Sequence, residues 1–128
     1  MNFGLALFCG IWYFVSVSKI GYHLSGTLGT PLFISFLLGL IMGDLQTALI
    51  LGASIQMLYL GLINTGGNVP ADGSLAALIA IPVALQTGMD TQAAVAIAVP
   101  FGVLGALLDQ VRRTVNAAWI HMADRYAE

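Results

Sequence analysis

The feature that most constrains this sequence is a series of long apolar runs that carry almost no charge. Apolar residues dominate positions 45–60 and resume at Leu75 with little pause as far as Leu108. Only 8% of the 128 residues are charged, while 59% are hydrophobic. A soluble domain carries about a quarter charged residues. Because so few charges cannot cover a protein surface in water, the sequence predicts an integral membrane protein made of one domain, residues 1–128.

One irregular polar segment, residues 61–75 (GLINTGGNVPADGSL), interrupts the apolar runs. Its glycines and its proline are incompatible with a regular helix. Such backbone is tolerated at membrane depth only where it is buried in protein or lines a wet cavity. A broken apolar segment that carries amides and a carboxylate is typical of a transport site. We therefore expect the functional residues in and around this segment.

The first half of the chain predicts two kinds of helix. Residues 3–18 predict a first helix that continues past Lys19 towards Leu24. Pro31 at a first helical turn predicts a second helix over residues 31–42, and Gly43 and Asp44 predict its end and the cap of the next. Twelve residues are too short to cross about 30 Å of hydrocarbon. With a returning helix over 44–63, the pattern favours a V-shaped re-entrant hairpin.

The second half predicts a short helix and a long one. Residues 75–85 form a short helix that we expect Pro82 to break and residues 86–88 to close. Asp90 or Thr91 should cap a long helix over residues 93–108, with a kink at Pro100. The fold class predicted is thus an all-α, multi-span membrane protein with re-entrant half-helix hairpins and a long kinked C-terminal helix.

After Leu108 the long helix is no longer mainly apolar and gains charged and polar residues. Three- and four-residue spacing places a set of polar side chains on one helix face. This set consists of Asp109, Arg112, Arg113 and Asn116. The end is therefore expected to be interfacial and to run out to the C-terminus. Most of the basic residues cluster there, so the positive-inside rule places this end in the cytoplasm.

Asp72 and Gln56 are candidate substrate-binding residues, each with a structural alternative. The Asp72 carboxylate can accept hydrogen bonds from substrate hydroxyls, or it can cap the helix that follows it. Gln56 lies in the middle of an apolar span, where a polar side chain is costly without a partner. It can open on a cavity shared with Asn64, about two helical turns away, or it can make a hydrogen bond between helices.

Asn64, Gly66 and Gly67 complete the candidate binding set. The Asn64 amide supplies both donors and acceptors, which suits a polyol, although an asparagine here can equally cap a helix or fill a turn. The two glycines allow a ligand to approach the backbone closely, or simply a tight turn. We expect no catalytic residue, cofactor or metal, because no phosphate-binding glycine motif, Walker lysine or metal-ligand spacing occurs. Nothing in the sequence resembles a basic nucleic-acid patch.

The ordered motifs of this chain resemble a known family. They are Pro31-Leu32, Leu38-Gly39, Gly43-Asp44-Leu45-Gln46-Thr47, Gly52, Gly61, Asn64, Gly66, Pro70-Ala71-Asp72, Leu75-Ala76, Ala98-Val99-Pro100, Arg113-Thr114-Val115 and His121-Met122-Ala123-Asp124. Each motif alone is weak, but their order over nearly the whole chain is specific. The chain resembles the membrane component IIC of the mannose/fructose/sorbose family of the bacterial phosphotransferase system. Chains of this family are about twice as long, so the resemblance is to their N-terminal half.

The resemblance implies a function and a set of partners. It implies a sugar-translocating subunit in the bacterial inner (cytoplasmic) membrane that takes up a hexose or amino sugar. Phosphorylation would be coupled through partner IIB, so the chain would not be an enzyme by itself. The partners implied are the membrane subunit IID, the phosphocarrier domains IIA and IIB, the sugar and the lipid bilayer, in a hetero-oligomer. The alternative is a truncated, non-transporting scaffold or assembly partner of the sister subunit.

Two positions depart from the pattern of the family. The family often has arginine immediately before the proline of the first half-helix, where this chain has Thr30. It often has glutamate where Gln56 stands. The loss of both charges indicates a shifted sugar preference or a relaxed paralogue.

Overall fold

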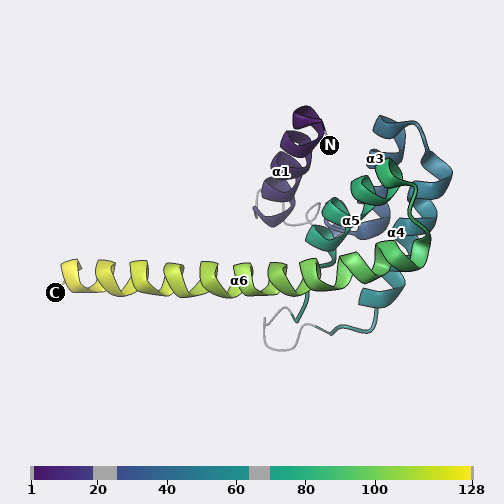
Figure 1. Ribbon diagram of the computed structural model, residues 1–128. Helices are drawn as coiled ribbons and strands as arrows, with labels where there is room; N and C mark the ends of the chain where they lie inside the picture. The colour runs from purple at the N-terminus through teal and green to yellow at the C-terminus, as the bar shows by residue number, and fades with distance from the viewer. Residues whose placement is uncertain (1, 19–25, 64–69, 128) are drawn as a thin grey trace.

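All regular secondary structure in the described part of the chain is helical. The computed structural model describes residues 2–18, 26–63 and 70–127, and among these residues no strand forms. The helices are α1 (Phe3–Val17), α3 (Pro31–Met42), α4 (Leu45–Tyr59), α5 (Gly73–Thr87) and α6 (Thr91–Ala127) (Figure 1). The predicted all-α class is therefore confirmed.

Helices α3 and α4 form a tight hairpin, and local signals explain both of its ends. Pro31 opens α3, and Gly43 closes it in the left-handed region at φ 79°. Asp44 then caps α4 by accepting a hydrogen bond of 3.1 Å from the Thr47 N–H, as predicted. The two helices approach closely because α4 offers Gly52 to the buried Ser35 of α3: a Cβ on Gly52 would overlap the Ser35 side chain.

Helices α5 and α6 form the second closely packed pair. Gly88, at φ 68°, ends α5, and Asp90 accepts a hydrogen bond of 3.2 Å from the Ala93 N–H at the start of α6. The prediction that Pro82 breaks the helix was wrong, because α5 continues through it to Thr87. Pro82 is fully buried, so tertiary packing holds the helix together despite the lost backbone donor. Helix α6 likewise continues through Pro100.

Two predicted helix ends were too late. Helix α1 ends at Val17, and Ser18 is extended at φ −73° and ψ 128°, so the helix ends one residue before the predicted residue 18. The predicted continuation past Lys19 towards Leu24 lies outside the described residues. Helix α4 ends at Tyr59 rather than at Ile63. Among the described residues, the left-handed glycines are Gly43 and Gly88, and neither follows α1 or α4, so the described residues after these two helices lack the strongest local stop signal.

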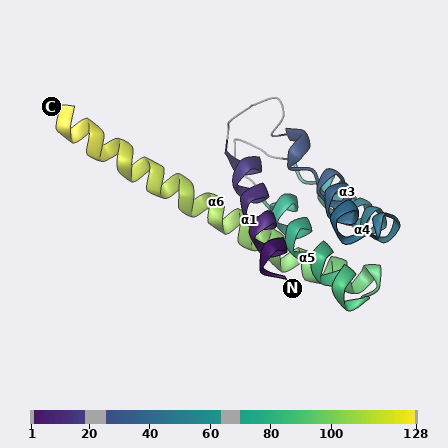
Figure 2. The same ribbon diagram turned by 90° about the horizontal axis from the view of Figure 1, so that it is seen from above.

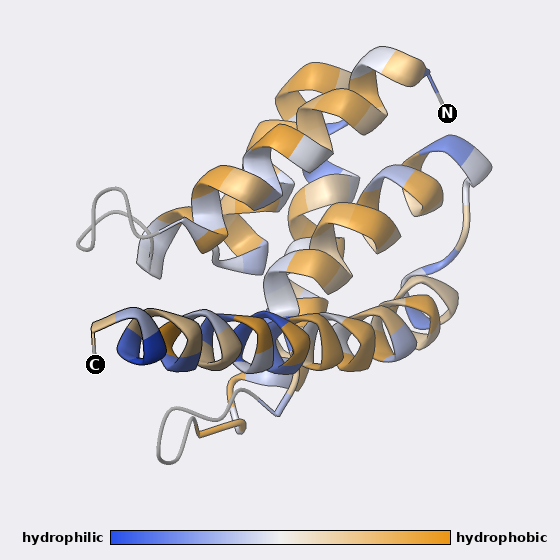
Figure 3. Cartoon of the chain, turned by 90° about the vertical axis from the view of Figure 1, so that its left-hand side faces the viewer, coloured by the Kyte–Doolittle hydropathy of each residue, from blue (hydrophilic) through white to orange (hydrophobic). Residues whose placement is uncertain are grey.

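The core lies where α3, α4, α5 and the first half of α6 meet. Its buried side chains are mainly small or branched: Ile34, Leu38, Ala48, Leu51, Ile55, Ala76, Ala77, Leu78, Ala80, Ile81, Ala84, Ala94 and Ala98. Small residues at helix interfaces let backbones approach, which is the packing typical of membrane helices. Hydrophobic residues make up most of these helices (Figure 3), and many of the large ones, such as Leu40, Ile41 and Ile50, are exposed.

The C-terminal half of α6 projects beyond the rest of the molecule as a single helix (Figures 1 and 2). All residues from Gln110 to Ala127 are exposed. Asp109 joins Arg112 and Arg113 in ion pairs of 2.7 Å each, so the predicted polar face is confirmed for these three residues. Among the described helices, α6 alone is long and apolar enough to cross a membrane by length and composition.

Candidate functional site

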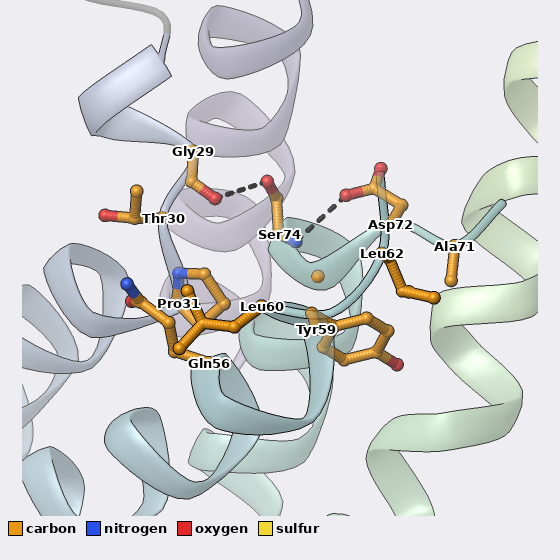
Figure 4. A pocket seen from close by; sticks show the side chains of 11 residues that line it. Gly29, Thr30, Pro31, Gln56, Tyr59, Leu60, Leu62, Ala71, Asp72 and Ser74 are labelled. Carbon is orange, nitrogen blue, oxygen red and sulfur yellow. Dashed lines mark hydrogen bonds between the residues drawn. The ribbon is translucent and has the colours of Figure 1, made fainter. Parts of the chain in front are cut away.

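Three helix ends surround a pocket of about 360 Å³ with both polar and apolar lining residues. The pocket lies between the start of α3, the end of α4 and the start of α5 (Figure 4). Its lining residues are Gly29, Thr30, Pro31, Gln56, Tyr59, Leu60, Leu62, Ala71, Asp72, Gly73 and Ser74. Two of the three helix ends are N-termini, where the helix dipole leaves a partial positive charge. A volume of this size lies within the usual range of small-molecule sites.

Asp72 is the charged residue of the pocket lining, and it also caps α5. Its Oδ1 accepts hydrogen bonds from the Ser74 N–H (2.9 Å) and the Leu75 N–H (3.3 Å). The capping alternative from the sequence is therefore confirmed. A carboxylate offers about four acceptor positions, so capping leaves capacity for a ligand. Whether Asp72 also binds a substrate stays a prediction.

Asp72 is held in place by two further contacts from distant parts of the chain. The Tyr13 hydroxyl of α1 donates to Asp72 Oδ2 at 2.9 Å. The Asp72 N–H donates to the Gly102 carbonyl of α6 at 2.9 Å. One turn further along α6, a Cβ on Gly105 would overlap the Cβ of Asp72. The carboxylate therefore sits at a junction of α1, α5 and α6, which fixes its position at the pocket.

Gln56 lies on the opposite side of the pocket and connects α4 with α3. Its Oε1 accepts a hydrogen bond of 3.0 Å from the Leu32 N–H. The predicted bond between helices is therefore confirmed. The same side chain also lines the pocket, but the predicted sharing of this cavity with Asn64 is untested, because Asn64 lies outside the described residues. A role in binding stays a prediction.

The remaining candidates cannot be placed. Asn64, Gly66 and Gly67 lie outside the described residues. The structure thus brings Gln56 and Asp72 to one pocket.

Sequence reasoning missed several residues that shape the pocket. Ser74 donates from its Oγ to the Gly29 carbonyl at 2.6 Å, which ties the start of α5 to the segment before α3 (Figure 4). Tyr59 donates to the Ala98 carbonyl at 3.2 Å and fills the wall towards α6. Ser74, two positions after Asp72, could have been suspected because a serine in a first helical turn often hydrogen-bonds locally. The Tyr13 contact carries no such signal.

The pocket has features that are typical of one class of protein, the membrane transporters. Helix ends, a carboxylate, an amide and hydroxyl groups converge on one pocket within a charge-poor helical bundle. Such a pocket can bind a small polar molecule through hydrogen bonds. Discontinuous helices whose ends face a binding site are the construction that many membrane transporters use.

Comparison with known proteins identifies the family. A family model described as the sorbose-specific IIC component of the phosphotransferase system matches residues 3–128. The chain is 38% identical over 98 residues to the sorbose-specific EIIC component of Lacticaseibacillus casei, which covers 77% of this chain and 35% of that protein. It is 33% identical over 98 residues to the mannose-specific EIIC component of Escherichia coli K12, covering 77% and 37%. With the fructose permease IIC component of Bacillus subtilis 168 it shares 32% identity over 103 residues, covering 80% and 38%.

The chain belongs to the sorbose-specific IIC component family of the sugar phosphotransferase system. The resemblance inferred from the ordered motifs is therefore confirmed, and with it the assignment to a family of membrane-embedded sugar permease components. The matches span just over a third of the length of these curated relatives.

Proposed function

We propose that this chain is the IIC subunit of a phosphotransferase-system permease and that it takes up a hexose or an amino sugar. The observation that carries the proposal is the pocket in which Asp72, Gln56 and Ser74 converge between helix ends. Hydroxyl groups of a sugar are both donors and acceptors, and they match a lining that offers carboxylate oxygens, an amide and a serine hydroxyl. Relatives named for sorbose, mannose and fructose support a sugar as the substrate.

We propose further that the chain lies in the bacterial cytoplasmic membrane, crosses it several times, and carries a re-entrant α3–α4 hairpin. Helix α3 has 12 residues, or about 18 Å at about 1.5 Å per residue, which is shorter than the roughly 30 Å of a hydrocarbon core. The hairpin would insert from the side on which the pocket opens, so that the partial positive charge at the start of α3 faces the sugar.

The proposed partners are a sister membrane subunit IID and the phosphocarrier domains IIA and IIB. The chain would not catalyse phosphoryl transfer by itself; it would deliver the sugar to IIB, which supplies the phosphoryl group. Asn64, Gly66 and Gly67 remain proposed members of the sugar site beside Asp72 and Gln56. We expect the isolated chain to bind sugar weakly, since a site open to water loses the benefit of enclosure.

Sugar uptake by Asp72 variants tests the proposal. The readout is uptake by cells that express the operon of this chain, with the chain deleted or replaced by a variant. Asp72→Asn should lower uptake about ten- to a hundredfold, because a charge-assisted hydrogen bond to a sugar hydroxyl is lost. The abundance of the protein should stay normal, since asparagine is also a good helix cap.

Asp44→Asn is the matched control, because Asp44 caps α4 in the same manner but does not line the pocket. It should change neither uptake nor abundance. Unchanged uptake in Asp72→Asn would restrict Asp72 to its capping role. Uptake that persists when the whole chain is deleted would instead favour the alternative of a non-transporting assembly partner.

A further inference from the structure

The start of α3 is capped in an unusual way that determines how Gln56 is oriented. Thr30 occupies the N-cap position, but its side chain makes no capping hydrogen bond; its hydroxyl donates instead to the Thr27 carbonyl at 2.8 Å. Pro31 has no N–H. The first backbone donor of α3 is therefore Leu32, and Gln56, 24 positions later on α4, accepts from it at 3.0 Å.

This contact assigns the two ends of the Gln56 amide. The oxygen and nitrogen of a glutamine amide are similar in shape, so their placement has to follow from hydrogen bonding. A backbone N–H can only donate, and it therefore requires the amide oxygen as its partner. The Gln56 carbonyl is committed to α3, and the Nε2 group, with its two donor hydrogens, is the end that remains.

The Gln56 side chain stands between two cavities. One is the pocket that contains Asp72. The other, also about 360 Å³, is lined by Thr27, Thr30, Leu32, Phe33, Phe36, Leu49 and Gln56. Thr30 and Gln56 are common to both linings, and Figure 4 shows the amide end of Gln56 beside Thr30 and Pro31. Among the described residues, the side chain of Gln56 makes no hydrogen bond other than the one to the Leu32 N–H.

We propose that Gln56 is a specificity-determining residue that presents hydrogen-bond donors to the substrate. This inference rests on the proposed sugar transport. The two sides of the pocket would then offer the sugar opposite hydrogen-bonding groups. Asp72 offers acceptors, whereas Gln56 offers the N–H groups of Nε2. The sugar group that faces Gln56 is therefore an uncharged oxygen acceptor, such as a hydroxyl or an acyl carbonyl. An ammonium group has donors only and cannot satisfy Nε2.

Gln56→Glu reverses this polarity while it keeps the cap. One carboxylate oxygen can replace the amide oxygen at the Leu32 N–H, where the helix dipole favours a negative charge. The second oxygen replaces the Nε2 donors with an acceptor and adds a charge that attracts an ammonium group. The abundance and thermal stability of the chain should therefore be retained, and its substrate preference should change.

The probes are mannose and mannosamine, which differ at carbon 2 by a hydroxyl or an amino group. Their competition is measured against uptake of the preferred sugar in cells that express the operon, in mildly acidic medium that keeps the amine protonated. Gln56→Glu should shift the ratio of inhibition constants about tenfold towards mannosamine. Gln86→Glu is the matched control, because Gln86 is exposed on α5 and lines neither cavity; it should leave the ratio unchanged.

Gln56→Met separates binding from folding. Methionine has a similar length but no hydrogen-bonding amide, so it should lower thermal stability through the lost cap and should not favour mannosamine. An unchanged ratio in Gln56→Glu at normal abundance, while the unmodified chain transports sugar, overturns the inference alone. Absence of sugar uptake by the unmodified chain would overturn the proposed function and this inference with it. A loss of abundance in Gln56→Glu as large as in Gln56→Met would show that the carboxylate does not replace the cap, and would also overturn it.

Discussion

The Tyr13 hydroxyl donates a hydrogen bond of 2.9 Å to Oδ2 of Asp72, across 59 positions of the sequence. This bond attaches α1 to the start of α5, at the edge of the pocket. It also leaves the other carboxylate oxygen to cap α5. The Asp72 side chain thus links the position of α1 to the start of α5, and the contact with α1 orients the carboxylate at the pocket.

Tyr13→Phe should lower the stability of the chain. The substitution removes the donor from a partly buried carboxylate and leaves the ring in place. Hydrogen bonds to charged groups contribute about 1.5–3 kcal/mol, and since this one is partly exposed we expect about 1 kcal/mol. Thermal unfolding in detergent, followed by circular dichroism, measures the effect.

Tyr126→Phe is the control for this measurement, because Tyr126 is 92% exposed at the end of α6. It makes the same chemical change away from any helix contact and should leave unfolding unaltered. Equal unfolding temperatures for the two variants would show that the Tyr13 contact contributes nothing to the fold.

The sequence predicted the helices best where both ends carry local signals. Helix α3 was predicted over residues 31–42 and is found at Pro31–Met42, because Pro31 and Gly43 mark its two ends. The ends of α1 and α4 were misplaced because, in the part of the chain that the structure describes, no left-handed glycine follows them. Pro82 misled the prediction, since a local rule ignores the packing that keeps α5 intact around it.

The candidate site was predictable in part for the same reason. Asp72 stands three positions before Leu75, where an apolar run begins, so its capping role could be inferred from the sequence alone. The convergence of Asp72 and Gln56 on one pocket also depends on how α5 packs against the α3–α4 hairpin, which no local pattern in the sequence shows. The contacts of Tyr13, Gly102 and Gly105 with Asp72 could not be predicted, because they depend on how α1 and α6 pack against α5 in space.

Gly105→Ala should disturb the junction at Asp72. The added Cβ would overlap the Cβ of Asp72, and neither atom can rotate away because both are fixed to backbone. Helix α6 must therefore move off the start of α5, at a cost of about 1–3 kcal/mol typical of overpacking. Thermal unfolding and the abundance of the chain in membranes measure this cost.

Gly4→Ala is the opposite case and serves as the control. Nothing lies within 4 Å of a Cβ at Gly4, and alanine should favour the helix over glycine by less than the roughly 0.8–1 kcal/mol of a helix interior, because Gly4 lies in the first turn of α1. The two variants should therefore change stability in opposite directions. A Gly105→Ala chain as stable as the unmodified chain would contradict the close approach of α6 to Asp72.

Gly43→Ala should weaken the α3–α4 hairpin through backbone conformation alone. Gly43 adopts φ 79°, and a Cβ there would meet nothing within 4 Å. The cost is therefore the left-handed conformation itself, about 1–2 kcal/mol for a residue with a Cβ. Gly43→Asn should cost less, because asparagine tolerates this region. Unfolding measurements that rank asparagine below alanine would contradict this explanation.

The last prediction concerns the topology of the α3–α4 hairpin. The single cysteine of the sequence is Cys9, so Cys9→Ser provides a background for labelling with a membrane-impermeant maleimide. In that background we introduce Thr30→Cys at the start of α3 and Asp44→Cys at the turn. If the hairpin is re-entrant, Thr30→Cys should label from one face only, and Asp44→Cys should label from the same face or poorly. The 12 residues of α3 cannot carry Asp44 across about 30 Å of hydrocarbon without thinning of the bilayer. Efficient labelling of the two positions from opposite faces would mean that α3 crosses the membrane, and the re-entrant proposal would then be wrong.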